Sequence, residues 1–589
     1  MNEFQSVALE REGSTADLVV EGGQVYCSNR REFLDRDVAI VGDRIAALLA
    51  DAESVTGPET TVVSAADSVV LPGLIDAHTH ADIQLLFDRE VPHLLASGTT
   101  SIVTESSGLG LLFGSRGVET FLERTADAPV SAYVSLPPQD FVDTFEPATG
   151  TPVELEALSD LLDHDRVVGV GEIDWIHVVG RDAPVEDLYD RTRERDLPIV
   201  GHGAGCRGES LRAFATVVDN DHEAISADGI RERAANGIHV VGRSGSIRDD
   251  LEALIDAYPD LDPRSVSLST DGVWPGDLLE GFGMAEIVRR LIDAGIEPAD
   301  AIDAASRNTA AHFGLADRGV VEPGAVADLL VVADLESMAV ETVLSEGEVV
   351  VADGEPLVDA RTDPYPDYVY DTISVDVSAE RFTAPLEAAP EGRVRAMAVD
   401  RGLVTTETTA DAAVVGGPDG SSRRLGPDPA TDVLTATVLD RDPATEERGF
   451  TGFLTGFGLE SGALATSAVW EATGLVTVAA DTDDAVVAAD RVASMGGGIA
   501  IARDGEVVAD LAMPVAGAAA ELPPEQFAAE FEALEDALRE AGVDIDRPLL
   551  TAQTLTFPGV PTLKLTAAGY ADVLGQSVVG LEPAADTDD

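Results

Sequence analysis

Two histidines two residues apart follow an aliphatic run in the stretch "LPGLIDAHTHADI", residues 71–83. Successive side chains of a β-strand point to opposite faces, so His78 and His80 share one face of a predicted strand. Imidazoles on one face can bind the same cation, whereas two neutral histidines in an apolar core would each need a hydrogen-bond partner. The spacing therefore predicts a metal-binding strand end, and the alternative is a core strand that carries two histidines.

Other metal-binding side chains follow the strand-like runs that come later in the chain. "VVGVGEI" carries Glu172, "LPIVGH" ends in His202, and "SVSLSTD" ends in Asp271. His222 lies in the short polar stretch "DNDHE". Catalytic residues of a (β/α)8 barrel gather at the carboxyl ends of its strands. Each residue alone could be structural, but together they predict one metal site with six candidate ligands: His78, His80, Glu172, His202, His222 and Asp271.

The elements that must position these residues alternate between short aliphatic runs and helical stretches over residues 73–316. This alternation predicts an α/β fold with a (β/α)8 TIM-like barrel. Residues 1–72 and 317–365 are rich in short strands and turns, and we expect them to pair into one small β-sandwich. Residues 366–580, with a Gly-rich turn and a long acidic helix, predict a separate C-terminal α/β domain. The acidic tail, residues 581–589, is expected to be disordered.

The charge balance excludes several kinds of partner. Asp and Glu number 108 against 38 Lys and Arg, which gives a formal net charge of -70, and Lys564 is the only lysine. Such a surface repels nucleic acid and is typical of a high-salt cytoplasm, where the Debye length falls to roughly 3 Å at molar salt. Two cysteines provide no disulfide framework, and we find neither a signal segment nor an apolar run of about 18 residues. We expect a halophilic, cytoplasmic protein that binds no nucleic acid and no membrane.

Several motifs occur together in an order that a known family shares. "PGLIDAHTH", "GHGAG", "NDHE", "STDG" and "EPGAVADLLVVADL" resemble landmarks of the metal-dependent amidohydrolase superfamily. "TGFGLESGALATS", "ASMGGGIAIARDGEVVADLAMPVAG" and "PTLKLTAAGYADV" extend the resemblance to the adenine deaminase family, in a form typical of haloarchaea. The resemblance implies a purine-salvage hydrolase that converts adenine and water to hypoxanthine and ammonia. It implies a small-molecule substrate, and a homodimer is one expected assembly.

The resemblance also implies roles for the site residues. It implies a pair of divalent metal ions, with Mn or Fe expected first and Zn as the alternative, because the ligands are imidazoles and carboxylates without thiolate. Many two-metal amidohydrolases bridge their ions with a carboxylated lysine, but no lysine precedes residue 564, so Glu172 is the expected bridge. Asp271 is the expected proton carrier, and Glu223 is a weaker candidate for a second proton carrier or a substrate contact.

Three segments depart from the family pattern. Adenine deaminases usually continue the first motif with Ile-Glu-Ser-Ser, where this chain has "ADIQ" at 81–84, and their next strand ends in Asp-Pro-His-Glu, where this chain has "TESSG" at 104–108. Their His-Asp-Ser-His-Asn stretch is replaced by Trp470, Glu471, Ala472, Thr473 and Gly474. Polar groups expected around the substrate are therefore changed. Two alternatives stay open: turnover of another cyclic amide, amidine or aminated heterocycle, and a paralogue that binds a purine or metal without turnover.

Most other candidate groups are assigned no chemistry. Cys206 is expected to be a small buried residue rather than a nucleophile, since no base accompanies it. His177 is left open, because it follows Glu172 by five residues in a loop that we expect at the barrel mouth. Structural or surface roles are expected for the remaining histidines, His93, His164, His239 and His312.

Overall fold

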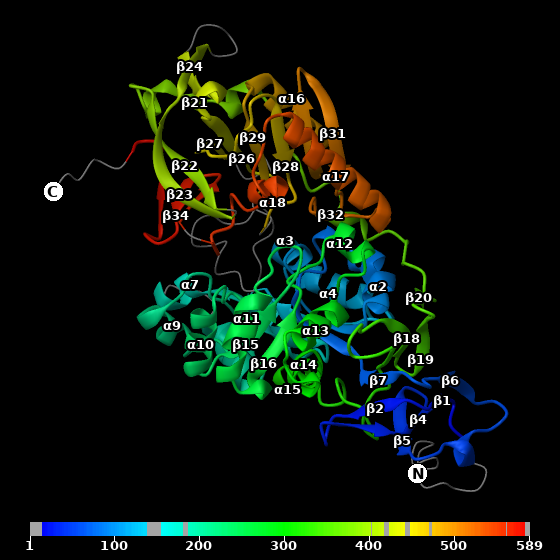
Figure 1. The fold of residues 1–589 in the computed structure, drawn as a ribbon. Coiled ribbons are helices and arrows are strands. Elements are labelled where there is room, and N and C mark those ends of the chain that lie inside the picture. The colour runs from blue at the N-terminus through cyan, green and yellow to red at the C-terminus, as the bar shows by residue number, and fades with distance from the viewer. Residues whose placement is uncertain are drawn as a thin grey trace.

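Eight parallel strands form a barrel in a computed structural model that describes residues 15–137, 155–180, 186–401, 403–416, 423–441, 448–470, 474–560 and 562–583. The ring closes where the Asp271 amide, just after the last strand, donates to the His78 carbonyl in the first, at 3.0 Å. The predicted TIM-like barrel is thereby confirmed (Figure 1). In sheet order the strands are β8 (Leu74–Thr79), β10 (Thr99–Glu105), β11 (Ser131–Leu136), β12 (Val167–Asp174), β13 (Ile199–His202), β14 (Asn220–Asp221), β15 (His239–Arg243) and β16 (Val266–Ser269).

The barrel strands are buried on both faces, as parallel strands covered by helices must be. Every residue of β10 and of β13 is buried. One apolar cluster brings together Ile75, Val168 and Val241 from strands spread around the ring, which only the inside of a closed barrel can do. Phe313, just after the helix α15 (Arg307–His312), packs into the same cluster.

The helices bury one apolar stripe each. In α13 the buried residues include Met284, Ile287, Val288 and Leu291, at the i, i+3, i+4, i+7 spacing of one helix face. Within the described ranges, no helix is long and apolar enough to cross a membrane. The other main helices of this region are α2 (Phe87–Ala96), α3 (Leu109–Phe113), α4 (Ser115–Arg124), α6 (Leu155–Asp160), α7 (Trp175–Gly180), α8 (Glu186–Glu194), α9 (Gly208–Phe214), α10 (Ala227–Ala235), α11 (Leu251–Ala257), α12 (Pro275–Leu279) and α14 (Pro298–Ala304), with α13 spanning Met284–Asp293.

Two sheets lie beside and below the barrel, and the larger one combines strands from both of its flanks (Figure 1). The four-stranded sheet holds β5 (Arg44–Leu49), β4 (Asp37–Val41), β1 (Leu18–Glu21) and β6 (Thr61–Ser64). The seven-stranded sheet holds β20 (Glu355–Pro356), β19 (Glu348–Ala352), β18 (Val340–Ser345), β17 (Leu329–Val332), β7 (Val69–Pro72), β2 (Gln24–Cys27) and β3 (Glu32–Asp35). Antiparallel pairing of β17 with β7 joins the segment after the barrel to the segment before it. The two sheets share one apolar cluster that includes Val20 and Val331.

The C-terminal region lies over the barrel mouth and has its own eight-stranded sheet (Figure 1). In sheet order its strands are β23 (Val404–Asp411), β22 (Arg393–Arg401), β27 (Gly449–Thr455), β26 (Leu434–Leu439), β29 (Leu475–Ala479), β28 (Ala463–Thr466), β30 (Gly498–Arg503) and β31 (Glu506–Ala512). Its helices are α16 (Thr482–Ser494), α17 (Pro524–Glu540) and α18 (Pro548–Gln553). A small sheet follows, with β33 (Leu563–Thr566), β34 (Gly569–Asp572) and β35 (Ser577–Val579).

Direct backbone pairing joins this region to the barrel. The strand β9 (Gln84–Leu85), in the loop after β8, pairs in parallel with β32 (Ala519–Ala520). The segment at 81–84 that departs from the family pattern is thus held by the C-terminal region. At the far end, Leu581 is buried and its carbonyl accepts from the Arg395 amide at 2.7 Å, so the packed chain reaches at least this residue. Residues 584–589 lie outside the described ranges, and the domain boundaries given above stay a prediction.

Candidate active site

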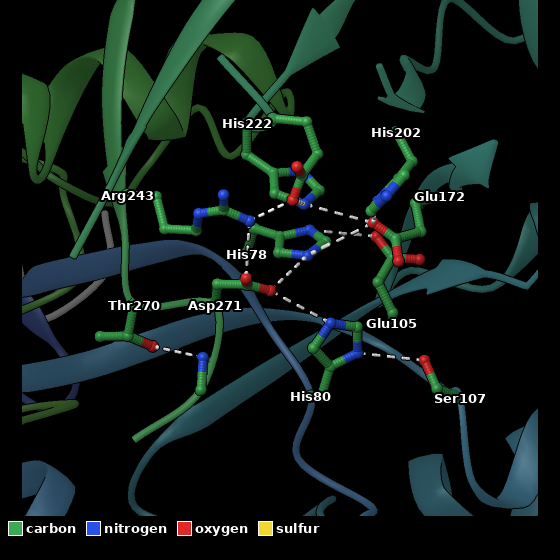
Figure 2. Close-up of polar contacts among 12 residues, drawn as sticks. His78, His80, Glu105, Ser107, Glu172, His202, His222, Arg243, Thr270 and Asp271 are labelled. Atoms are coloured by element: carbon green, nitrogen blue, oxygen red, sulfur yellow. Dashed lines mark hydrogen bonds and ion pairs between the residues drawn. The ribbon is translucent and has the colours of Figure 1, made fainter. Parts of the chain in front are cut away.

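All six candidate ligands lie at the carboxyl ends of barrel strands, and their side chains converge (Figure 2). His78 lies in β8 and His80 directly follows it, while Glu172 lies near the end of β12. His202 ends β13, His222 directly follows β14, and Asp271 comes two residues after β16. The five side chains other than Glu172 are buried, and that of Glu172 is 14 % exposed.

Glu172 is the centre of this cluster. Its Oε2 lies 2.9 Å from His202 Nδ1, 3.3 Å from His222 Nε2 and 3.8 Å from His78 Nε2. One carboxylate oxygen therefore faces three imidazoles that come from three different strands. A carboxylate in this position can contact metal ions on either side of it.

Asp271 faces two imidazoles, one of which also faces Glu172. Its Oδ1 lies 3.4 Å from His78 Nε2 and 3.3 Å from His80 Nε2. His78 thus faces both carboxylates, and three overlapping sets of potential ligand atoms lie within 4.8 Å of one another: His78, His222 and Asp271; His78, His80 and Glu172; Glu172, His202 and His222.

The donor set fits a divalent metal ion. His78 Nε2 and His202 Nε2 are buried, and neither has a hydrogen-bond partner among the described residues. A buried polar atom without a partner is costly, and a metal ion would satisfy an imidazole lone pair. Nitrogen and carboxylate oxygen without thiolate suit Zn, Fe or Mn. The geometry therefore supports a metal centre at this position.

Electrostatics keep the two central carboxylates ionised. Burial would raise the pKa of Glu172, but the neighbouring imidazoles, His202 first, hold it well below its usual value. Burial would likewise raise the pKa of Asp271, which Arg243 and the histidines hold well below its usual value. Burial, with the neighbouring His78, lowers the pKa of His222 to about 3. Ionised carboxylates and the neutral His222 are forms that bind a metal. Burial would lower the pKa of His78 and His202, but the neighbouring carboxylates hold it above the usual value, so these two rings would release protons on binding a metal.

Arg243 is a functional residue that our sequence analysis missed. It ends β15 and is buried, and its Nη1 donates to Asp271 Oδ2 at 2.9 Å (Figure 2). The same nitrogen also donates to Glu223 Oε1. Asp250 accepts from its Nη2 at 2.8 Å. A single guanidinium therefore orients both predicted proton carriers. The sequence contains a signal for Arg243, because "HVVGR" is a strand run that ends in a charged residue. A guanidinium is not a metal ligand, so the pattern of histidines and carboxylates does not include it.

The two departing segments of the barrel bond to each other. Asp82 is buried and accepts from the Ser106 hydroxyl at 3.1 Å, from the Gly108 amide at 3.0 Å and from the Leu109 amide at 2.8 Å. A carboxylate with three donors is well satisfied and needs no contact in the cavity. The substitutions at 81–84 and 104–108 thus form one local network.

The same segment supplies two neighbours of the candidate ligands. Ser107 Oγ lies 3.1 Å from Nδ1 of His80, which fixes the ring so that Nε2 faces Asp271. Glu105 ends β10 with Oε1 at 3.5 Å from His78 Nδ1, and neither of its oxygens has a hydrogen-bond partner among the described residues. A hydrogen bond such as that of Ser107, or a nearby carboxylate such as Glu105, can orient an imidazole that binds a metal. Our sequence analysis treated both residues only as departures from the family pattern.

The departing segment of the C-terminal domain does reach the barrel mouth. Trp470 packs edge-to-face against His80, with ring centroids 4.9 Å apart, and Phe557 lies in the same way 5.3 Å from His202. Glu471, Ala472 and Thr473 lie outside the described residues, and Gly474 begins the next described segment. An aromatic pair from the C-terminal domain therefore covers candidate ligands of the barrel.

A cavity of about 180 Å³ opens at this cluster. Five of the six candidate ligands line it, together with Glu223 and Arg243. The rest of its lining is mainly apolar or backbone: Ala204, Gly205, Ile225, Ile247, Arg248, Leu403, Val404, Trp470, Thr554, Phe557 and Val560. This combination of an apolar wall with a few charged groups is typical of a small-molecule site.

The cavity lining includes neither His177, which the sequence leaves open, nor the groups with no expected chemistry, Cys206, His239 and His312. Cys206 is buried, and burial raises the pKa of its thiol to about 12, so no thiolate forms at neutral pH. His177 is buried in α7, where burial lowers its pKa to about 4. His239, at the start of β15, and His312 stack on each other with centroids 4.3 Å apart, far along the strand from the site.

Comparisons with known proteins identify the family of the chain. The amidohydrolase family model matches residues 69–350, and the model of the adenine deaminase C-terminal domain matches residues 403–577. The adenine deaminase of Desulfatibacillum aliphaticivorans is 31% identical, over 97% of this chain and 98% of its own. That of Methanococcoides burtonii is 31% identical, over 95% and 94%.

Among solved structures, a β-aspartyl dipeptidase from Fervidobacterium islandicum is similar at 19% identity, over 58% of this chain and 98% of its own, with a TM-score of 0.47. The relatives named above carry the assignment, because their similarity covers both the barrel and the C-terminal domain. The chain belongs to the adenine deaminase family of the metal-dependent amidohydrolases, and it is a hydrolase of carbon–nitrogen bonds.

Proposed function

We propose that the protein deaminates adenine, converting adenine and water to hypoxanthine and ammonia in purine salvage. The observation that carries the proposal is the convergence of six candidate metal ligands, five of which line one cavity that the C-terminal domain covers. The adenine deaminases among its relatives match it over nearly their whole length. The small cavity with an apolar wall suits a flat heterocycle.

We propose that His78, His80, Glu172, His202, His222 and Asp271 hold one or two divalent ions, with Glu172 between them. When bound, the ions lower the pKa of a water molecule from 15.7 toward about 7, which makes hydroxide available at neutral pH. Mn or Fe is the expected metal and Zn the alternative, since no thiolate lies among the ligands. Arg243 and the imidazoles keep the carboxylates ionised for this task.

The remaining steps fall to residues of the chain. The hydroxide oxygen forms a bond to the purine carbon that bears the amino group, and Asp271 takes the proton that the water gives up. Asp271 then passes this proton to the amino nitrogen as the carbon–nitrogen bond breaks and ammonia leaves. Glu223, which lines the cavity and shares Arg243 with Asp271, is the proposed second carrier and moves the remaining hydroxyl proton to a ring nitrogen. Hypoxanthine is the product, and atoms balance.

A second candidate is the same chemistry on another cyclic amide, amidine or aminated heterocycle. The cavity lining favours it, because Trp470 replaces one of the polar groups of the family pattern and Phe557 adds a second aromatic ring. A site without such groups discriminates poorly between flat heterocycles of similar size.

The charge of -70 supports a halophilic, cytoplasmic enzyme, and the two cysteines are unpaired. A homodimer is the proposed assembly, which light scattering in molar KCl would test. The expected salt requirement and the proposed dimer do not enter the chemical steps above, but both set the conditions of the assay.

The test is ammonia release from a panel of purines, pyrimidines and hydantoins, in molar KCl with added Mn. We expect release from adenine or another aminated heterocycle, and loss of release in Glu172→Gln. Glu90→Gln is a matched control, because Glu90 lies outside the cavity at the candidate ligands. Metal-loaded protein that releases ammonia from no compound of the panel would exclude the proposed function and leave a non-catalytic paralogue.

A further inference from the structure

Besides Trp470, the C-terminal domain contributes five residues to the cavity lining, which we call the cavity roof: Leu403, Val404, Thr554, Phe557 and Val560. Two separate segments form it. Leu403 and Val404 stand at the start of β23, and the other three residues follow α18. Since the two segments are distant in sequence, contacts within the folded C-terminal domain must hold them next to each other over the barrel.

Lys564 joins the two roof segments. This residue lies in β33 and is fully buried. Its Nζ donates to the Leu403 carbonyl and to the Thr554 carbonyl, both at 3.1 Å. Each carbonyl belongs to a residue that lines the cavity. The amine therefore lies directly behind the roof and bonds to both of its halves.

Neighbouring bonds tie β33 to the same place. The Thr405 hydroxyl donates to the Leu563 carbonyl at 2.6 Å, and the Thr562 amide donates to the Thr405 carbonyl at 3.0 Å. Thr554 directly follows α18, and the carbonyl end of a helix attracts a cation. Lys564 is thus the central member of a small network, and its amine bonds to backbone carbonyls rather than to a carboxylate.

The residue type is informative because it is unique. The chain has 38 Lys and Arg, of which one is Lys564 and 37 are Arg. An arginine here would bury five rigid donors where two carbonyls accept, whereas a lysine head is compact. Burial lowers the pKa of Lys564 to about 7, and even the neutral amine keeps two N–H donors for its two acceptors. Lysine, which occurs nowhere else in the chain, therefore matches the two carbonyls better than arginine would.

We propose that Lys564 is a positioning residue for substrate binding: it holds the Leu403 and Thr554 segments together, and so sets the height of the apolar roof over the candidate metal ligands. The inference rests on the proposed function for its substrate, a flat aminated heterocycle. The roof geometry itself does not depend on turnover.

The first test is hydrogen exchange, followed by mass spectrometry, on Lys564→Met, which keeps the chain length but removes the donors. Peptides that cover residues 403–405 and 554–560 should exchange about tenfold faster than in wild type, because both segments lose a hydrogen-bond partner. The control is Tyr570→Phe, in the neighbouring β34, whose fully buried hydroxyl accepts from the Phe453 amide at 2.6 Å. It should leave exchange of the roof segments unchanged.

The second test compares the same variants, with Lys564→Arg added, for ammonia release and for hypoxanthine binding by calorimetry. Lys564→Met should raise KM and the hypoxanthine Kd about tenfold, with kcat changed less than threefold, since the groups that do the chemistry stay in place. The KM and hypoxanthine Kd of Lys564→Arg should lie between those of wild type and Lys564→Met. Tyr570→Phe should have the KM of wild type even if its Tm is lower.

Unchanged roof exchange in Lys564→Met, or equal losses of binding in Lys564→Met and Tyr570→Phe, would overturn the proposal. If Lys564→Met does not fold, Lys564→Arg serves in both assays, and wild-type values from it contradict the proposal as well. Failure of the proposed function looks different: the wild type then releases no ammonia, while the exchange result still decides the role of Lys564.

Discussion

Trp470 of the C-terminal domain packs edge-to-face against His80 of the barrel, with ring centroids 4.9 Å apart. The indole also lines the cavity at the candidate ligands. A residue that replaces a polar family position therefore touches a candidate metal ligand directly. The C-terminal domain is part of the site, and its substitutions bear on substrate choice.

Exchange of residues 470–474 for His-Asp-Ser-His-Asn should raise adenine deamination relative to wild type. Donors that bond a substrate edge contribute roughly 10⁴-fold or more in discrimination, and Trp470 replaces such a group with an aromatic ring. Steady-state ammonia release from adenine measures the effect. Trp470→Phe, which keeps an aromatic ring, is the control and should not raise adenine turnover. A wild-type kcat/KM on adenine above about 10⁵ M⁻¹s⁻¹ would show that no contact is missing.

Arg243→Met should lower kcat/KM by about 10²-fold or more and reduce stability. It leaves the buried carboxylates of Asp271 and Glu223 without their shared partner, and breaking a buried ion pair costs about 3–5 kcal/mol. The control is Arg124→Met, because Arg124 is also buried in an ion pair, with Asp88 at 2.7 Å, but lies outside the cavity lining. Ammonia release and thermal melting would be measured together. Equal effects of the two substitutions would argue against a special role for Arg243.

Salt should stabilise the fold. A net charge of -70 repels itself at low ionic strength, and screening at molar salt shortens the Debye length to roughly 3 Å. Dilution from 2 M to below about 0.5 M KCl should therefore lower Tm, given the same screening. Sucrose, which screens no charge, should not restore the lost Tm to the same extent. A melting temperature that does not depend on salt would remove the halophilic interpretation.

Acid should destabilise the protein through the stacked pair His239 and His312. Burial lowers the pKa of His312 to about 4 and, with His312 beside it, that of His239 to about 2. Both values lie below the ordinary 6.5, so the unfolded chain binds protons first. Stability from this pair is fully present above about pH 6.5 and is lost as pH falls from there toward 4.

The measurement is the free energy of unfolding at pH 7.5 and at pH 5, for wild type and for His312→Gln. His312 Nε2 accepts from the Asn220 amide group at 2.7 Å, and a glutamine oxygen can replace that acceptor without titrating. The variant should lose less stability between the two pH values than wild type. Identical losses in the two proteins would contradict the assignment.

The barrel and its six candidate ligands could be predicted because each signal is local. A strand run followed by histidine or carboxylate marks one strand end, and the barrel topology brings all such ends to one face. Arg243 ends its strand in the same way and was missed only because a guanidinium is no metal ligand. The family resemblance placed residues 470–474 near the substrate, but the ring contact of Trp470 with His80 could not be predicted, since no local pattern encodes how side chains of two domains pack against each other.

Anomalous diffraction from crystals of the Mn-loaded protein tests the central claim most directly. We predict one or two Mn peaks at the barrel mouth, bonded by His78, His80, Glu172, His202, His222 and Asp271 at about 2.0 to 2.2 Å, the distances expected for nitrogen and oxygen ligands. Glu172 should contact each ion where two are present. A peak away from these residues, or three of the six lying more than about 10 Å from the rest, which no metal–ligand bond can span, would contradict the account.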